Sequence, residues 1–223
     1  MPLMLDPLLD PAAPKIDYAR RYMVEEYFEI EARTGLRHEY YEGEIFPLDG
    51  PDAPPGMMSG ATRRHNDLVY SYRRALTERL RNSSCRAYAE NVRTRVAETG
   101  KYLFPDVVVT CAEDDRDERS VMTPTVIVEV LSDSTELRDR DWKMEQYLLI
   151  PTLMQHVLIN QYRVLVESYT RGAGQSWIRT SYDDRAALVP FPVLQFEVSV
   201  AELYESVQVP EFRLWGNPLP PSE

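Results

Sequence analysis

Two carboxylates, Glu129 and Asp106, stand where the sequence otherwise predicts buried strands. Glu129 interrupts the apolar run TVIVEVL at 125–131, and Asp106 follows Pro105 and opens the run VVV. A buried carboxylate must be neutralised, paired or bound to a cation, because an unpaired charge is costly to remove from water. If neighbouring strands bring the two acids together, they can hold one hard cation such as Mg²⁺, with the backbone carbonyl of Val130 as a third oxygen. The alternatives are an arginine partner for Glu129 and a turn-capping role for Asp106.

A helix predicted after the SDS sequence at 132–134, running to about Ile150, adds a possible cationic group. Asp139, Lys143 and Tyr147 are four residues apart, so they share one face of this helix. The chain has only three lysines among its 25 basic residues, which suggests a specific use for the ammonium of Lys143. Beside a metal, it can position a water molecule and neutralise phosphate charge. The alternative is a solvated lysine paired with Asp139.

These segments resemble the Uma-two family, a member of the PD-(D/E)XK superfamily of restriction-endonuclease-like proteins. The resemblance rests on the residues PDVVV, VIVEVLSDST and RDRDWKMEQY, and it extends to the segments EEYFEIE, EYYEGEI and RRHNDL. It implies an α/β fold with a mixed central β-sheet flanked by helices. The chain departs from the family pattern at 155–157, where QHV replaces a Tyr-Trp pair, and at Asn160, where an aspartate is common.

The resemblance assigns roles to particular residues. Asp106 and Glu129 are the motif acids that hold Mg²⁺ or Mn²⁺, and Glu44 is a further candidate ligand. Leu131 occupies the place of the usual motif lysine, so Lys143 is its replacement. Tyr147 is an orienting hydroxyl or a packing residue, and Asp139 is an auxiliary group.

The implied reaction is metal-dependent hydrolysis of phosphodiester bonds by an endonuclease, with DNA as the expected substrate. Two alternatives remain: a catalytically silent nuclease-fold module that binds nucleic acid or a protein, and a phosphoesterase acting on small nucleotides. The net charge of −11 argues against nonspecific attraction to nucleic acid. Residues 61–95, however, hold nine arginines and three acids, a local charge of +6. This stretch is a solvated face or a nucleic-acid contact, with these candidate residues: Arg63, His65, Arg74 and Arg81.

Pattern and turn residues predict a single nuclease-like domain at 19–206, between a flexible arm at 1–18 and a tail at 207–223. The expected helices are 19–33, ending at Gly35, 61–81, the helix up to Ile150 and a short one at 200–206. The expected strands are a pair joined at Glu42-Gly43, 85–98, 102–111, 125–131, 154–160, 163–170 and 177–182.

The remaining expectations concern the setting of the protein. Cys85 and Cys111 form no CxxC pair, so we expect neither a zinc site nor a disulfide framework, and a reducing cytoplasmic location. The first 15 residues show no signal peptide or membrane span. Homodimerisation is expected, because open sheet edges and the aromatic residues Phe212 and Trp215 need cover.

Overall fold

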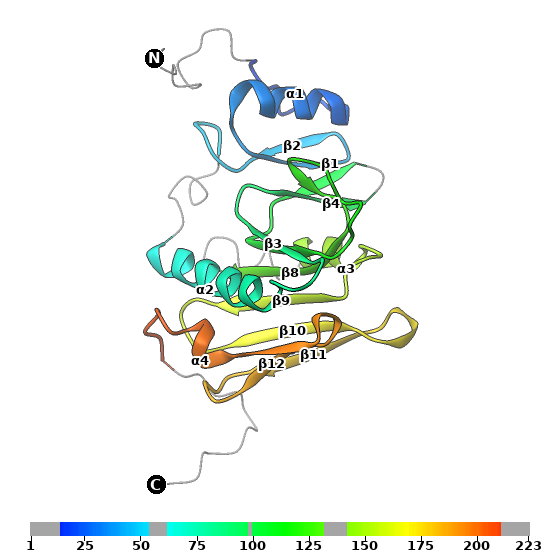
Figure 1. Cartoon of the computed structure of the whole chain (residues 1–223). Helices are drawn as coiled ribbons and strands as arrows, with labels where there is room; N and C mark the ends of the chain where they lie inside the picture. Colours follow the sequence, from blue (N-terminus) through cyan, green and yellow to red (C-terminus); the bar gives the residue numbers. More distant parts are fainter. Residues whose placement is uncertain (1–13, 54–61, 98–99, 132–141, 211–223) are drawn as a thin grey trace.

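Two mixed β-sheets, a two-stranded hairpin and four α-helices make up the part of the chain that the computed structural model describes, which is residues 14–53, 62–97, 100–131 and 142–210 (Figure 1). The architecture is mixed α/β, as expected. In Figure 1, α1 lies at one end of the molecule, the larger sheet occupies the middle, and the two-stranded hairpin lies toward the other end. Within the described ranges, no helix combines the length and apolar composition needed to cross a bilayer.

The larger sheet has six strands and carries Glu129 at its centre. In sheet order its strands are β11 (Trp177–Tyr182), β10 (Val166–Arg171), β9 (Gln155–Asn160), β8 (Pro124–Leu131), β6 (Val107–Thr110) and β3 (Arg86–Ala89). Only the β8–β9 pairing is parallel among these neighbours. Central strand β8 is buried at seven of its eight positions, which explains its unbroken apolar sequence.

Alternation along β8 decides which way Glu129 points. Val126, Val128 and Val130 belong to the core cluster that includes α2 (Arg63–Arg79), whereas Ile127 belongs to a second cluster on the opposite face. Because successive strand residues face opposite sides, Glu129 shares the face of Ile127. On that face the six-stranded sheet meets α3 (Met144–Leu148) and the smaller sheet.

The smaller sheet has five strands, in the order β2 (Glu44–Pro47), β1 (His38–Tyr41), β5 (Lys101–Leu103), β4 (Arg93–Ala97) and β7 (Ser120–Val121). The expected strand pair with its turn at Glu42-Gly43 is β1–β2. Helix α1 (Val24–Thr34) packs on this sheet, with the rings of Tyr27 and Tyr40 stacked at 4.9 Å. It ends at Gly35, whose φ of 68° suits the left-handed cap that glycine favours.

Two stretches expected as single strands are each divided between the two sheets. The 85–98 stretch breaks into β3 and β4 at Glu90 and Asn91, which adopt φ values of 47° and 59°. The 102–111 stretch breaks into β5 and β6 around Asp106, after Pro105 removes a backbone donor. The two breaks are joined, because the Glu90 N–H donates to the Asp106 carbonyl at 3.1 Å. Asp106 therefore sits at the crossing between the sheets, outside either ladder.

The segment 188–207 covers the face of the larger sheet opposite Glu129. A hairpin of β12 (Leu188–Phe191) and β13 (Phe196–Ser199) leads into α4 (Val200–Leu203), the expected short helix. Two 3-10 turns, Ala173–Gln175 and Pro192–Leu194, complete the described elements. Val207 is still buried in this core, and near the other end Ile16 packs against the cluster under α1. Of the predicted helix up to Ile150, residues 132–141 lie outside the described residues.

The cysteine prediction is wrong: Cys85 and Cys111 form a disulfide. Cys85 precedes β3 and Cys111 follows β6, and the paired residues Arg86 and Thr110 set their register. The next position along the two strands places the cysteines opposite each other, with Cα atoms 3.9 Å apart. The bridge therefore fastens edge strand β3 to its neighbour.

Reducing this disulfide should lower the free energy of unfolding by about 3 kcal/mol, because the bridge closes a loop across a sequence separation of 26 in the unfolded chain. Urea unfolding followed by tryptophan fluorescence, with and without dithiothreitol, measures the difference. A Cys85→Ser/Cys111→Ser double variant should be insensitive to the reductant. Equal midpoints with and without reductant for the parent chain, together with two titratable thiols in the denatured oxidised protein, would contradict the bridge.

Candidate active site

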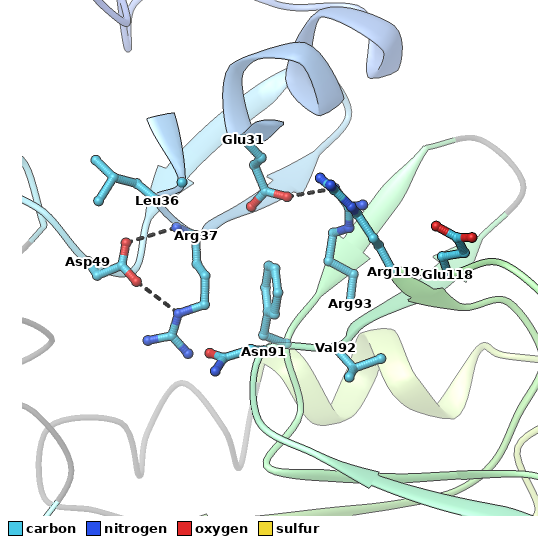
Figure 2. A pocket seen from close by; sticks show the side chains of 11 residues that line it. Glu31, Leu36, Arg37, Asp49, Asn91, Val92, Arg93, Glu118 and Arg119 are labelled. Carbon is cyan, nitrogen blue, oxygen red and sulfur yellow. Dashed lines mark hydrogen bonds and ion pairs between the residues drawn. The ribbon is translucent and has the colours of Figure 1, made fainter. Parts of the chain in front are cut away.

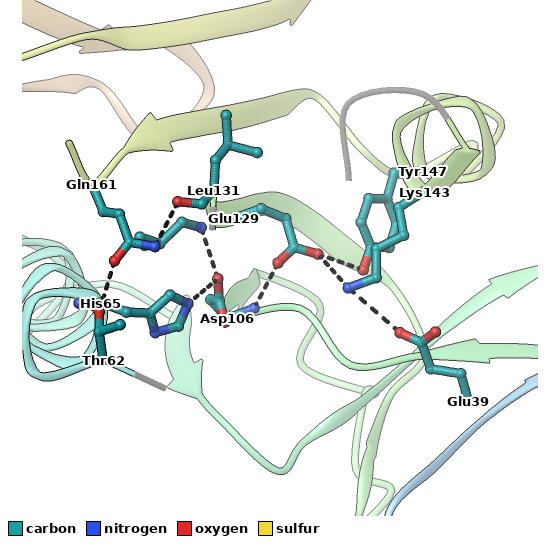
Figure 3. Close-up of polar contacts among 10 residues, drawn as sticks. Glu39, Thr62, His65, Asp106, Glu129, Leu131, Lys143, Tyr147 and Gln161 are labelled. Carbon is teal, nitrogen blue, oxygen red and sulfur yellow. Dashed lines mark hydrogen bonds and ion pairs between the residues drawn. The ribbon is translucent and has the colours of Figure 1, made fainter. Parts of the chain in front are cut away.

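Asp106 and Glu129 lie side by side, and each carboxylate accepts a hydrogen bond from a backbone N–H of the other segment (Figure 3). The N–H of Val130, next to Glu129, donates to Oδ2 of Asp106 at 2.7 Å. In return, the N–H of Asp106 donates to Oε2 of Glu129 at 3.3 Å. The pairing of Val107 with Val128 places the two acids at the same end of adjacent strands. The two carboxylates that sequence reasoning singled out are thus neighbours on one side of the sheet.

Glu129 is only 2% exposed, and two side chains from the segment 143–147 stabilise its charge. The Tyr147 hydroxyl donates to Oε1 at 2.9 Å, and Nζ of Lys143 lies 3.4 Å from the same oxygen. Burial and the neighbouring Glu129 charge raise the pKa of Tyr147 well above its ordinary value. Tyr147 therefore remains a neutral phenol that donates a hydrogen bond to the carboxylate.

Lys143 also joins the two sheets. Its Nζ lies 3.4 Å from Oε1 of Glu39, a fully buried residue of β1, as well as 3.4 Å from Glu129 of β8. Figure 3 shows the ammonium between these two carboxylates. The group of charges thus contains three acids and one lysine, contributed by both sheets and by the residue that precedes α3.

Glu39 is a member of this group that sequence reasoning missed. We expected Glu44, but its carboxylate is 44% exposed and accepts a hydrogen bond from Arg21 at 2.8 Å. The structure therefore does not bring Glu44 to Asp106 and Glu129. The structure shows that Glu39 stands inside a strand whose first three residues are all buried, so it needs a partner for the same reason as Glu129.

Asp106 is supported from the other side by helix α2. Nε2 of His65, in the first turn of α2, lies 3.3 Å from Oδ2 of Asp106. Burial raises the pKa of the Asp106 carboxyl, but the hydrogen bond and charge of His65, the Val130 N–H and the charge of Lys143 outweigh it and hold the pKa below its ordinary value. Asp106 is therefore ionised at neutral pH.

A chain of hydrogen bonds fixes the start of α2 against the end of β8. The Thr62 side chain accepts from the N–H of His65 at 3.0 Å, which is the usual N-cap arrangement. Thr62 then donates to Gln161 at 2.7 Å, and Gln161 donates to the carbonyl of Leu131 at 2.9 Å. The position of His65 is thus tied to the strand that carries Glu129.

The uncharged side chain of His156 packs against the ring of Tyr147. Its ring lies 5.4 Å from the Tyr147 ring in an edge-on arrangement, and it is fully buried on β9. Burial, and then the charge of Lys143, lower the pKa of His156 to about 3. The imidazole is therefore uncharged at neutral pH and orients the Tyr147 ring by packing.

Apart from Val130, the other predicted residues that the structure describes do not contact this group. Arg63 and Arg81 are exposed at the two ends of α2, whereas Arg74 forms an ion pair with Glu205 at 2.7 Å. Val130 contributes its backbone N–H to Asp106. Asp139 lies outside the described residues. Among the described residues, no group of three or more His, Cys, Asp or Glu side chains is arranged to hold a metal ion.

The mixed α/β fold agrees with the restriction-endonuclease-like class that the sequence resemblance implied. The family model Uma2, described as "Putative restriction endonuclease", matches residues 24–201. The chain therefore belongs to the Uma2 family. Two proteins of Synechocystis sp. are similar to it, "Uncharacterized protein sll1609" and "Uncharacterized protein slr1290". The first is 28% identical, covering 76% of this chain and 92% of its own length, and the second is 29% identical, covering 71% and 78%.

A solved structure supports the fold. The crystal structure of a protein from Anabaena variabilis, described as "a putative nuclease belonging to DUF820", superposes with a TM-score of 0.62 at 18% identity. The match covers 82% of this chain and 98% of the other. The mixed α/β architecture described above is therefore shared with that protein.

Replacing Tyr147 by phenylalanine should lower the free energy of unfolding by about 1–3 kcal/mol, because a buried carboxylate loses a hydrogen-bond donor. Tyr72 provides a matched control: it is equally buried, and its hydroxyl has no hydrogen-bond partner among the described residues. Tyr72→Phe should change stability by less than about 0.5 kcal/mol or increase it slightly. Denaturant unfolding measures both variants, and equal losses would show that the Tyr147 hydroxyl gives Glu129 no particular support.

Proposed function

We propose that this protein is a metal-dependent endonuclease that hydrolyses phosphodiester bonds in DNA. The observation that carries the proposal is the reciprocal pairing of Asp106 and Glu129 beside a buried lysine. A structural ion pair needs one acid and one base, whereas here two acids share one ammonium and a third acid, Asp106, lies beside Glu129. Membership of the Uma2 family supports the same reading.

The donor set fits Mg²⁺ or Mn²⁺. Both ions prefer oxygen ligands, and Mg²⁺ is commonly held by one or two carboxylates, with waters and substrate phosphates completing its coordination. Asp106 and Glu129 would supply those carboxylates. Asp106 is ionised, as a ligand must be, and its side chain is 21% exposed, so it can meet a substrate. When bound, the metal would polarise the phosphate and make an attacking water more acidic.

The other residues of the group hold the carboxylates and the phosphate in place. Lys143 puts a fixed positive charge 3.4 Å from Glu129, where it can stabilise negative charge that builds up on the phosphate in the transition state. Tyr147 fixes the orientation of Glu129, and Glu39 holds Lys143 from the opposite sheet. His65 holds Asp106 and places the start of α2 beside the reacting phosphate.

Helix α2 is the proposed contact surface for the nucleic-acid backbone. Arg63 and Arg81 are exposed near the two ends of the helix, and the first turn of the helix carries His65 beside Asp106. Arg74 and Arg79 lie on the same helix, but ion pairs with Glu205 and Glu202 neutralise them. This division explains how a chain with a net charge of −11 can still present local positive charge to a phosphate backbone.

A non-catalytic binding module is the second candidate, and one observation favours it. Oε1 of Glu129 is already occupied by Tyr147 and Lys143, so the acids have protein partners without a metal. In that case Asp106 and Glu129 serve only the fold. Calorimetric titration with Mg²⁺ separates the two functions. A metal-dependent nuclease should bind Mg²⁺ in the millimolar range and lose this binding in Asp106→Ala, whereas a silent module need not bind Mg²⁺ at all.

Asp106→Ala should reduce nicking of supercoiled plasmid in Mg²⁺ by roughly a hundredfold or more, because a catalytic metal supplies several kcal/mol of transition-state stabilisation. The fold should remain intact, since the variant also relieves repulsion between two adjacent carboxylates. Asp114→Ala, an exposed acid of the 113–118 loop, is the matched control and should nick like the parent. Parental activity in Asp106→Ala would overturn the proposed mechanism.

Arg63→Gln and Arg81→Gln should each weaken binding to duplex DNA uniformly across sequences and reduce the salt dependence by about one counterion. Arg79→Gln should have little effect on binding, because both of its terminal nitrogens are engaged by Glu202 at 2.9 and 2.8 Å. Fluorescence anisotropy at several salt concentrations, with Asp106→Ala as background to prevent cleavage, compares the three. Equal effects of all three substitutions would place the DNA elsewhere.

A further inference from the structure

A cavity lies apart from Glu39, Asp106 and Glu129, between the end of α1 and the segments at the start of β4 and before β7 (Figure 2). Its volume is about 600 Å³, within the range of small-molecule sites. Three arginines line it, namely Arg37, Arg93 and Arg119. Neither the acids nor Lys143 contributes to its wall, so the proposed active site does not account for it.

Asp49 holds the Arg37 guanidinium through its Nε, which leaves the two terminal nitrogens available to a ligand. Its backbone N–H and its Nε each donate to one oxygen of Asp49 at 2.8 Å, so both carboxylate oxygens of Asp49 are engaged. Figure 2 shows the guanidinium extending toward Asn91, with its two terminal nitrogens beyond the Asp49 contact. Asp49 thus orients the guanidinium without occupying those nitrogens.

Arg93 and Arg119 add positive charge to the opposite wall. Arg93 pairs with Glu31 at 2.6 Å, and the second oxygen of Glu31 accepts the His38 N–H at 2.8 Å. Arg119 accepts the Arg93 N–H through its backbone carbonyl, while its exposed side chain forms no ion pair with any described residue. Two of the three lining acids are therefore saturated by protein donors, and two guanidinium groups retain free donors. Glu118 is the remaining acid, and it is exposed.

The wall between these arginines is unusual in its backbone. Asn91, and Glu90 before it, adopt φ values of 59° and 47°, and left-handed conformations at non-glycine residues often mark functional sites. Phe104 provides an aromatic surface in the same cavity. The first segment is bound to Asp106, since the Glu90 N–H donates to the Asp106 carbonyl, and Phe104 precedes Asp106 by two residues in the chain.

We propose that this cavity binds a phosphate-bearing ligand of mononucleotide size. Arg37 and Arg119 hold the phosphate, because planar guanidinium groups bind phosphate oxygens in pairs. The side chains of Asn91 and Phe104 receive the nucleoside, through hydrogen bonding and ring contact. The phosphate comes either from a free nucleotide or from a nucleotide of a bound nucleic acid, and the proposal holds whether or not the chain cleaves DNA.

Calorimetric titration of Asp106→Ala with dAMP, inorganic phosphate and deoxyadenosine tests the proposal without interference from cleavage. We expect saturable binding of dAMP, weaker binding of phosphate and none of deoxyadenosine. Arg119→Gln should weaken dAMP binding roughly tenfold, in keeping with the loss of a charge-assisted hydrogen bond. Arg116→Gln, an exposed arginine of the neighbouring loop that does not line the cavity, should bind like the parent.

Absence of saturable dAMP binding up to about 10 mM would overturn the proposal, because weaker binding would not indicate a specific site. So would equal binding of deoxyadenosine and dAMP, or equal weakening by Arg119→Gln and Arg116→Gln. A short single-stranded oligonucleotide then identifies the source of the phosphate. Displacement of dAMP supports a nucleotide of the nucleic acid as occupant, and simultaneous binding supports a free nucleotide.

Discussion

The buried ammonium of Lys143, shared by Glu39 and Glu129, is the interaction on which the rest of the structure depends. The two carboxylates come from different sheets, and both are almost completely removed from water. An uncompensated carboxylate in the interior is strongly destabilising, and the Lys143 ammonium offsets the charge of both acids. The lysine therefore links the two sheets electrostatically where their apolar clusters also meet.

Asp106 joins this group of charges because of where it stands in the chain, at the crossing between the two sheets. The chain leaves the smaller sheet after Leu103 and enters the larger one at Val107, and Pro105 stands in this crossing. A residue at such a break need not pack into either sheet, so its carboxylate can turn to the Val130 N–H and to His65. The same break leaves the Asp106 side chain partly exposed, while Glu129 remains enclosed. One acid thus faces outward and the other is held from behind by Tyr147.

The central part of the site could be predicted from the sequence, and its periphery could not. Glu129 stood out because a charge in an unbroken apolar strand needs a partner, and its spacing to Asp106, Lys143 and Tyr147 carried the family resemblance. Glu39 was missed because its partner is remote in the chain and depends on how the two sheets pack. The interruption beside Asp106 could be predicted, because Pro105 lacks a backbone donor. The break at Glu90 was missed because Glu90-Asn91 lacks the glycine that usually marks a positive φ. The disulfide was missed because its pairing depends on strand register, which cysteine spacing does not reveal.

The crossing at Phe104–Asp106 marks a dividing line between the two sheets, with charged groups on both sides. Glu39 moves with one sheet and Glu129 with the other, so any rotation between the sheets must change the distances at Lys143. The arginine-lined cavity borders the same line through Asn91 and Phe104. The cavity and the group of charges at Lys143 therefore share the region where the two sheets meet, and the geometry of both depends on the angle at which the sheets pack.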